Sequence, residues 1–196
     1  MTRLALDDAA VIEASRTEPD RFASLFDRHA PHIHRYLARR VGAQAADDLV
    51  AETFLVAFGK RAGYDPRFRD ARPWLYGIAT NLAGQHRREE VRRFRLRQSA
   101  GPAPVQNDDA ERAVVNLTAQ SIRVTLGNAL VTLAKADRDV LLLIAWEQLS
   151  YEEVARALGI PIGTVRSRLH RARTKIRKIL EGSPAAAVYE EILTNE

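Results

Sequence analysis

The segment from Ser150 to Leu180 has the pattern of two short helices joined by a tight turn. Ser150 is followed three residues later by Glu153, which is the spacing of a capping box at a helix N-terminus. Gly159 can adopt the left-handed conformation that ends a helix, and helical periodicity resumes after Pro161. The segment therefore predicts a helix-turn-helix, which limits this part of the chain to a helical fold.

The second of these helices has an unusually one-sided charge. At 100° per residue, one stripe holds the apolar side chains of Val165, Leu169, Ala172, Ile176, Ile179 and Leu180. The opposite face holds Arg166, Ser167, His170, Arg171, Thr174, Arg177 and Lys178. Between Gly159 and Leu180 there are seven Lys or Arg residues and no Asp or Glu. A surface of one sign suits a polyanion, so we expect this helix to read DNA.

Recognition helices place their N-terminal residues at base edges in the major groove, while flanking cations hold phosphates. By that rule the candidates for base contacts are Arg166, Ser167, His170 and Arg171. Arg173 and Lys175 flank the apolar stripe and are the candidates for phosphate contacts. The alternative is an ordinary surface helix pair whose basic residues serve solubility.

The composition limits the class of protein. A chain of 196 residues with 46% hydrophobic residues can form one large or two small folded domains, and its net charge of +5 favours an acidic partner. The absence of cysteine excludes disulfides and thiolate metal sites. We find no signal-peptide pattern and no run of 18 apolar residues, so we expect a cytoplasmic protein without membrane insertion.

Helical periodicity recurs along the rest of the chain and strand signals are nearly absent, so the predicted fold class is all-α. We expect helices at 20–40, where Pro31 predicts a kink or a break, at 47–59, and from Pro73 to about Arg97. Small residues, prolines and acids at 99–109 indicate a flexible linker. The predicted organisation is a helical domain at 1–97, a linker at 98–115, a helix-turn-helix domain at 116–181 and a tail at 182–196.

The helix that follows Pro73 is predicted to be amphipathic. Its apolar side holds Leu75, Ile78, Ala79 and Leu82, with Trp74 at the boundary. The other side holds Gly77, Thr80, Asn81, Gly84, Arg87 and Arg88. Aromatic and basic residues interleave from 68 to 97, a pattern that can stack unpaired bases. Trp74 could equally belong to the core, with the arginines forming a solvated helix end.

An acidic pair stands out in an otherwise basic chain. Asp48 and Glu52 are four residues apart and therefore share one face of the predicted helix at 47–59. Two interpretations stay open for this pair from the sequence alone. The carboxylates could form a docking patch, or they could simply favour the positive end of the helix dipole at its N-terminus.

One group of potential metal ligands comprises Asp27, His29, His32 and His34. Pro31 interrupts their helix and their spacing is not of the HExxH type, so we expect surface histidines, no metal and no cofactor. The chain has no nucleophile–base arrangement, no phosphate-binding glycine loop and no paired catalytic carboxylates. We therefore expect a protein that is not an enzyme.

Four segments in order resemble the extracytoplasmic-function (ECF) subfamily of bacterial RNA polymerase sigma factors. FDRHAPHIHRYLARR is similar to the start of the family's first domain, DDLVAETFLVAF to its core-binding helix and RPWLYGIATNLAGQHRRE to its −10-reading helix. LAKADRDVLLLIAWEQLSYEEVARALGIPIGTVRSRLHRAR is similar to its second, −35-reading domain. The resemblance covers residues 20 to 180.

This resemblance implies roles for particular residues. It makes Asp48 and Glu52 contacts to a coiled coil of the polymerase β′ subunit. It assigns −10 recognition, melting and a flipped base to Phe68, Arg72, Trp74, Asn81 and Arg88. It implies a linker that is threaded through the polymerase near the active site and the RNA exit path. It also implies that the protein binds the β′ and β subunits of core polymerase and promoter DNA, and that an anti-sigma factor controls it. Two positions depart from the family pattern: Ala51 replaces a frequent Gln, and Gln85 replaces Asp or Asn.

The predicted function is promoter recognition and transcription initiation with core RNA polymerase. The first rival is a stand-alone repressor or activator, which would bind duplex DNA without polymerase and have no use for Asp48 and Glu52. A second rival, a metal hydrolase built on the histidine group, needs more ligands than the chain supplies.

Overall fold

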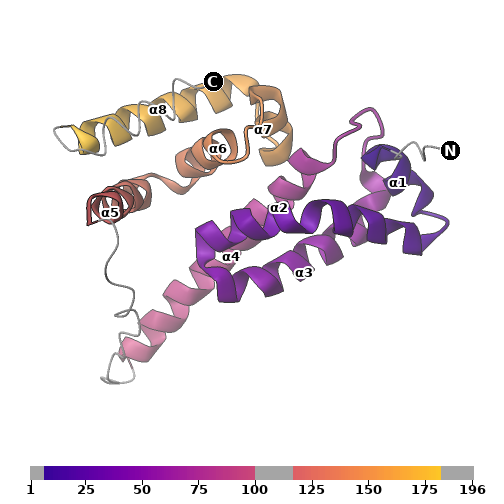
Figure 1. Cartoon of the computed structure of the whole chain (residues 1–196), viewed down its shortest axis with the longest axis horizontal. Coiled ribbons are helices and arrows are strands. Elements are labelled where there is room, and N and C mark those ends of the chain that lie inside the picture. Colours follow the sequence, from indigo (N-terminus) through magenta and orange to yellow (C-terminus); the bar gives the residue numbers. More distant parts are fainter. Residues whose placement is uncertain (1–6, 100–116, 182–196) are drawn as a thin grey trace. The chain divides into compact units, whose positions relative to one another are not determined.

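The computed structural model describes residues 7–99 and 117–181, and within these two ranges it contains eight α-helices, two 3₁₀ turns and no strand (Figure 1). The helices are α1 (Asp8–Ala14), α2 (Ala23–Val41), α3 (Ala43–Lys60), α4 (Arg72–Ser99), α5 (Leu117–Thr132), α6 (Lys135–Ala145), α7 (Tyr151–Leu158) and α8 (Ile162–Leu180). The 3₁₀ turns are Pro19–Phe22 and Arg61–Gly63. The predicted all-α class is confirmed for the described residues.

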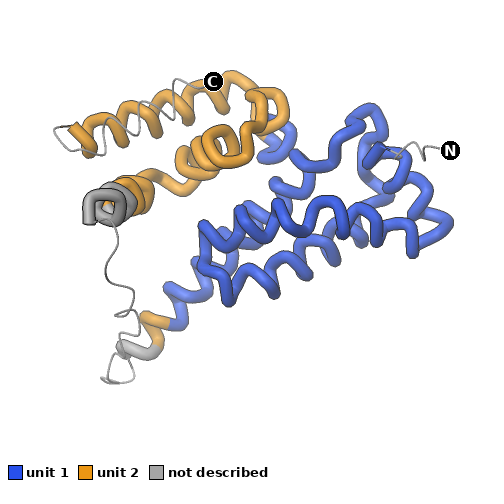
Figure 2. Tube along the Cα trace, in the orientation of Figure 1, with its two compact units in different colours: residues 1–93, 155–159 blue, residues 94–154, 160–196 orange. Residues whose placement is uncertain are grey.

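The chain divides into two compact units (Figure 2). The first comprises residues 1–93 and 155–159, and the second comprises 94–154 and 160–196. Of the predicted linker at 98–115, only residues 98 and 99 are described, as the end of α4. The predicted tail at 182–196 lies outside the described residues.

The first unit is built around the hairpin of α2 and α3, which lie side by side (Figure 1). Gly42 alone separates the two helices, and its φ of 91° is one that residues with a side chain rarely adopt. Leu25, Ile33 and Leu37 on α2 are almost completely buried, at 0–1% exposure. Burying such side chains stabilises the unit by roughly 1.5–3 kcal/mol each.

Pro31 does not break α2, which stays helical from Ala23 to Val41. A proline inside a helix removes one backbone hydrogen bond and costs about 3 kcal/mol. The buried side chains of Ile33 and Leu37 follow within two turns and offset that cost through their packing. The break that the sequence allowed at this proline is therefore overridden by tertiary contacts.

Helix α3 begins at Ala43, one turn before the start predicted at Asp47. Gly42, not an acidic residue, precedes its first turn, and that turn contains no acid. Asp47 and Asp48 therefore lie inside the helix. The error arose because two adjacent acids resemble a helix start, whereas the tight turn at Gly42 leaves no room for a longer loop.

Helix α4 is buried on more sides than its sequence pattern predicts. Leu75 and Ala79 are fully buried as expected, but Thr80, predicted on the polar side, is also 0% exposed. The Thr80 hydroxyl lies 2.7 Å from the hydroxyl of Tyr36 on α2, and either atom can donate the hydrogen bond. This pairing lets a polar residue enter the core without losing its hydrogen bond.

The second unit has a core formed by α6 and α8, with α5 packed against α8. On α6, residues 140 to 144 are all buried. On α8, the predicted apolar stripe is buried at Val165, Leu169, Ala172, Ile176 and Leu180. Ile179, predicted within that stripe, is instead 41% exposed because it lies at the edge of the stripe near the helix end.

The turns on both sides of α7 have defined geometry. The predicted capping box is confirmed: the Ser150 N–H donates to Glu153 Oε2 at 2.8 Å, and the Glu153 N–H donates to Ser150 Oγ at 3.2 Å. Gly159 has a φ of 62°, as its role in ending α7 requires. After α6, Gln148 adopts a φ of 53°, a conformation that the sequence did not reveal because glycine or asparagine is usual there.

Replacing Ser150 with Ala removes one of the two capping bonds and should destabilise α7 by about 1 kcal/mol. Amide hydrogen exchange of the α7 backbone measures this free energy of opening. Glu153→Gln is the matched control, because glutamine also completes a capping box and should leave exchange nearly unchanged. Equal exchange in Ser150→Ala and the wild type would contradict the role of the box.

Candidate nucleic-acid interface

The segment between α3 and α4 folds back on itself around the side chain of Tyr64. This side chain is 7% exposed, and its hydroxyl donates to the carbonyl oxygen of Phe68 at 2.6 Å and lies 3.2 Å from that of Asp70. Asp70 in turn accepts a hydrogen bond from the backbone N–H of Arg72, the first residue of α4, at 2.8 Å. The loop is thereby fixed against the start of the helix that follows it.

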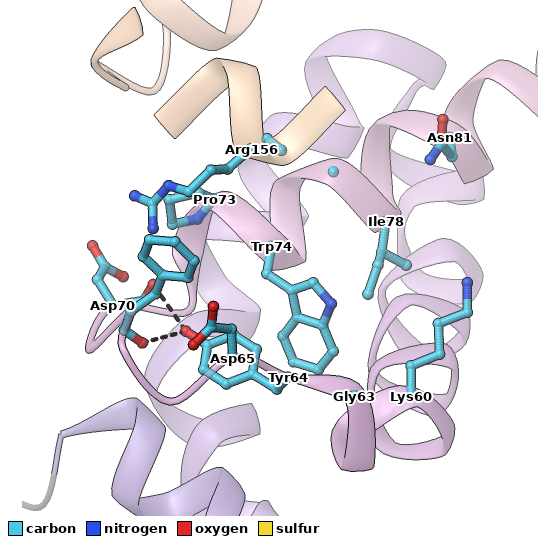
Figure 3. Close-up of a pocket in the computed structure, with 13 residues that line it drawn as sticks. Lys60, Gly63, Tyr64, Asp65, Asp70, Pro73, Trp74, Ile78, Asn81 and Arg156 are labelled. Atoms are coloured by element: carbon cyan, nitrogen blue, oxygen red, sulfur yellow. Dashed lines mark hydrogen bonds between the residues drawn. The ribbon is translucent and has the colours of Figure 1, made fainter. Parts of the chain in front are cut away.

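A cavity of about 420 Å³ lies against this loop and the first turns of α4 (Figure 3). Its lining comes from the end of α3, the loop and one side of α4, and residues 156 and 157, which belong to the same compact unit, complete it. The lining residues before α4 are Lys60, Gly63, Tyr64, Asp65, Phe68 and Asp70. Those on α4 are Pro73, Trp74, Gly77, Ile78 and Asn81.

The cavity combines aromatic walls with polar atoms. The ring centroids of Tyr64 and Trp74 are 4.9 Å apart, and the Trp74 indole lies along the cavity in Figure 3. Burial raises the pKa of Tyr64, and the carboxylates of Asp8 and Asp70 raise it further, so its hydroxyl remains a hydrogen-bond donor. A flat apolar surface beside convergent donors and acceptors is suited to a planar heteroaromatic ring.

The structure brings together three of the five residues assigned to −10 recognition. Phe68, Trp74 and Asn81 all line the cavity. Arg72 and Arg88 do not: the Arg72 guanidinium forms an ion pair with Asp70 at 2.9 Å, and Arg88 is exposed further along α4. These two arginines lie where they can meet a phosphate backbone and not a base inside the cavity.

Sequence reasoning missed several lining residues because they lie between the helices predicted at 47–59 and from Pro73, where no periodic pattern indicates which side chains are buried. Tyr64 and Asp65 carried the available signal: a large aromatic residue in a short polar loop usually has a packing role, and here it is buried. Lys60 could not be anticipated, because its position depends on where α3 ends.

Helix α3 presents an exposed face away from the core of the first unit. Asp48 and Glu52 are both exposed and lie in the body of the helix, so capping of an N-terminus does not explain them. Leu55, one turn further on the same face, is 71% exposed, the largest value among the exposed large hydrophobic side chains of the described residues. The exposure of this leucine beside two carboxylates was not predicted.

Helix α8 carries the basic face predicted from its sequence. Arg166, Ser167 and His170 are exposed on the side opposite the buried stripe. Arg171 is held by Asp137 of α6, with its Nη2 2.9 Å from Oδ1, and this carboxylate raises the pKa of Arg171. Lys175 Nζ donates to the carbonyl oxygen of Thr132, the last residue of α5, at 2.6 Å. Arg173, the other predicted phosphate contact, is half-buried.

The histidines considered as metal ligands have other partners. His29 is buried, with Nε2 2.8 Å from Asp8 Oδ2, and His34 Nε2 lies 3.1 Å from Asp47 Oδ1 on the surface. His32 forms a hydrogen bond with Arg35. Among the residues described, no three His, Cys, Asp or Glu side chains are close enough together to hold a metal ion.

Comparison with known proteins matches both units to one family. Sigma-70 region 2 matches residues 25–93, and Sigma-70 region 4 matches residues 123–176. RNA polymerase sigma factor CarQ of Myxococcus xanthus is 36% identical over 165 residues, which span 82% of this chain and 90% of CarQ. ECF RNA polymerase sigma factor SigE of Mycolicibacterium smegmatis is 32% identical over 182 residues, 91% of this chain and 68% of SigE. The chain belongs to the ECF subfamily of sigma-70 RNA polymerase sigma factors.

This ECF sigma factor is a transcription initiation factor and not an enzyme. Its fold is similar to that of RpoE in the co-crystal structure with the anti-sigma factor NepR from Bartonella quintana, with a TM-score of 0.58 and 23% identity. That likeness covers 82% of this chain and 97% of RpoE. Within residues 7–99 and 117–181 the sigma factor has no helix of the length and apolarity that crossing a membrane requires.

Replacing Tyr64 with Phe should destabilise the first unit by about 1–3 kcal/mol, because the carbonyl groups of Phe68 and Asp70 lose a buried donor. Urea unfolding followed by Trp74 fluorescence measures this loss. A Trp146→Phe background leaves Trp74 as the single reporter, since the chain has two tryptophans. Tyr151→Phe, in the second unit, is the control and should not shift the transition; an unshifted transition in Tyr64→Phe would contradict the assigned role.

Proposed function

We propose that the cavity beside α4 receives a base of the promoter −10 element that has been flipped out of the duplex. The arrangement of Phe68, Trp74 and Asn81 around one cavity carries this proposal, since it offers stacking surfaces together with an amide that reads hydrogen-bonding edges. Arg72 and Arg88 contact the phosphates on either side. Extrusion of a base costs a few kcal/mol, so a fitted pocket makes opening depend on sequence.

The second contact with the promoter is the −35 element, read by α8 in the major groove. Arg166, Ser167 and His170 provide base contacts at the exposed N-terminal half of the helix, with Arg171 beside them. The ion pair with Asp137 holds the Arg171 guanidinium in a defined direction before DNA binds. Lys175 and Arg173 contact phosphates. To do so, Lys175 gives up its hydrogen bond to the Thr132 carbonyl oxygen and binds a phosphate oxygen instead.

Core RNA polymerase binds the exposed face of α3. Asp48 and Glu52 supply negative charge on a chain with a net positive charge, and Leu55 supplies an apolar contact on the same face. We assign this docking to the β′ subunit, as the resemblance of the acidic helix implies. Ala51, exposed beside Glu52, cannot make the hydrogen bonds of the glutamine frequent at this position.

These assignments divide the chain by role. Residues 1–97 bind polymerase and open the −10 element, residues 98–115 pass through the polymerase as a linker, and residues 116–181 anchor the complex at −35. The chain as a whole contacts the β′ and β subunits. An anti-sigma factor regulates the protein, a proposal supported by the similar fold of RpoE in its complex with NepR. Because the sigma factor acts with polymerase on the chromosome, its site of action is the cytoplasm.

Reversing both charges on the α3 face, Asp48→Lys with Glu52→Lys, should weaken binding to core polymerase at least about tenfold, because like charges then meet across the interface. Fluorescence titration of labelled sigma factor with core polymerase measures this affinity. Asp47→Lys is the matched control: it lies on the same helix but on a different face, and should bind normally. Undiminished affinity in the double variant would contradict docking through this face.

Replacing Arg166 with Ala should lower the preference for the correct −35 element by about 1–3 kcal/mol, the usual contribution of a bidentate base contact. Arg171→Ala should act in the same direction. Competition binding of the holoenzyme to promoters with and without a −35 element measures the preference. Lys175→Ala, which removes a phosphate contact, should weaken binding to both promoters alike. Unchanged selectivity in both arginine variants would reject α8 as the recognition helix.

A further inference from the structure

The short N-terminal helix α1 lies across the loop that forms one wall of the cavity. At its C-terminal end, Arg16 Nη2 donates to the carbonyl oxygens of Ala62 and Tyr64, at 3.0 and 3.4 Å. Arg61 Nε donates to the carbonyl oxygen of Ser15 at 3.2 Å, which completes this contact from the opposite side. The beginning of the loop is therefore attached to the end of α1.

The other end of the loop is attached to the start of α1 through Asp8. The backbone N–H of Asp8 donates to the carbonyl oxygen of Arg69 at 3.1 Å, and the backbone N–H of Ala71 donates to Asp8 Oδ2 at 2.9 Å. The same carboxylate contacts His29 Nε2 at 2.8 Å and forms an ion pair with Arg28, both on α2. One side chain thus joins α1, α2 and the residue directly before α4.

Asp8 is only 5% exposed, and charged side chains are rarely buried to this extent unless they are paired. Burial by itself raises the pKa of its carboxyl, but the hydrogen bond from His29, the hydrogen bond from the Ala71 N–H, the charge of His29 and the hydrogen bond from Arg28 together hold the pKa below its ordinary value. The carboxylate is therefore charged inside the protein. A buried charge is tolerated only while its donors stay in place, so Asp8 fixes the positions of the groups that surround it.

The groups that Asp8 fixes lie next to the cavity. Arg69, whose carbonyl oxygen accepts a hydrogen bond from the Asp8 N–H, lies between Phe68 and Asp70, which both line the cavity. Ala71 lies shortly before Pro73 and Trp74, which line the cavity from α4. Tyr64, whose carbonyl oxygen is contacted by Arg16, is the aromatic partner of Trp74. Every attachment between α1 and the loop is thus within three residues of a wall of the cavity.

We propose that α1, through Asp8 and Arg16, positions the walls of the base-binding cavity, and that these two residues are positioning residues for −10 recognition. The proposal rests on the function proposed above for the cavity. It goes beyond a general role in stability, because it ties α1 to the capture of a base and to no other step. Core docking through α3 and −35 binding through α8 do not depend on it.

The test uses holoenzyme formed from the full chain and a fork-junction DNA taken from a promoter that the wild-type holoenzyme transcribes. An abasic residue placed at each position of the −10 element in turn identifies the position where the wild type loses most affinity. Asp8→Ala and Arg16→Ala holoenzymes are then compared on the intact and the abasic DNA at that position. Trp74→Ala, which removes a wall of the cavity, is measured beside them.

We expect Asp8→Ala to weaken binding to intact DNA roughly tenfold and binding to the abasic DNA hardly at all, with Arg16→Ala acting in the same direction and less strongly, as for coupled neighbours in one network. Asp8→Asn, which keeps one oxygen to accept from Ala71, should recover part of the loss. Combining Asp8→Ala with Trp74→Ala should weaken binding no further than the stronger single change. Because Arg16 is exposed, its variant stays informative where Asp8→Ala fails to fold.

Ser15→Ala is the matched control for stability. It removes a buried hydrogen bond of 2.6 Å to the Ile12 carbonyl within α1 and leaves every α1–loop bond in place, so it should not distinguish the two DNAs. Two results would overturn the positioning role, provided that Trp74→Ala still distinguishes intact from abasic DNA. One is that Asp8→Ala and Arg16→Ala lose equal affinity for both DNAs, and the other is that neither variant loses affinity. A Trp74→Ala variant that binds both DNAs like the wild type would instead overturn the function proposed for the cavity.

Discussion

A loop that lines a cavity must keep its own backbone groups hydrogen-bonded, and the loop between α3 and α4 does so through its own Tyr64 and through Asp8 and Arg16 from the N-terminal segment. The Tyr64 hydroxyl meets two of its carbonyl oxygens, Arg16 meets two more and the Asp8 carboxylate takes the N–H of Ala71. An unpaired buried backbone group costs about as much as a lost hydrogen bond. The shape of the cavity therefore depends on these three side chains, one from the loop and two from outside it.

Helices α3 and α8 each have one side that forms the core and another that carries exposed charged residues. In α3 the buried side holds the hairpin with α2, while the exposed side carries Asp48, Glu52 and Leu55. In α8 the buried stripe packs on α6, while Arg166, Ser167 and His170 are exposed on the opposite side. Because the core is formed by one side of each of these helices, the exposed side can carry unbalanced charge or an apolar side chain without disturbing that packing.

Local signals predicted the elements whose geometry is set locally. The capping box at Ser150, the turn at Gly159 and the buried stripe of α8 follow from spacing alone, and the structure confirms them. Features that depend on distant partners could not be predicted. Thr80 enters the core only because Tyr36 meets it, and Asp8 is buried only because donors from α2 and the loop converge on it. Phe68, Trp74 and Asn81 were named from the family resemblance, whereas their meeting in one cavity needed the structure.

The central claim is that one chain reads a promoter at two separate points, with a base-binding cavity for −10 and a basic helix for −35. Transcription by core polymerase from a library randomised at both elements tests it most directly, with Trp74→Ala and Arg166→Ala compared with the wild type. The account predicts that Trp74→Ala changes the preferred sequence only at −10 and Arg166→Ala only at −35. Variants that alter both elements together, or neither, would contradict it.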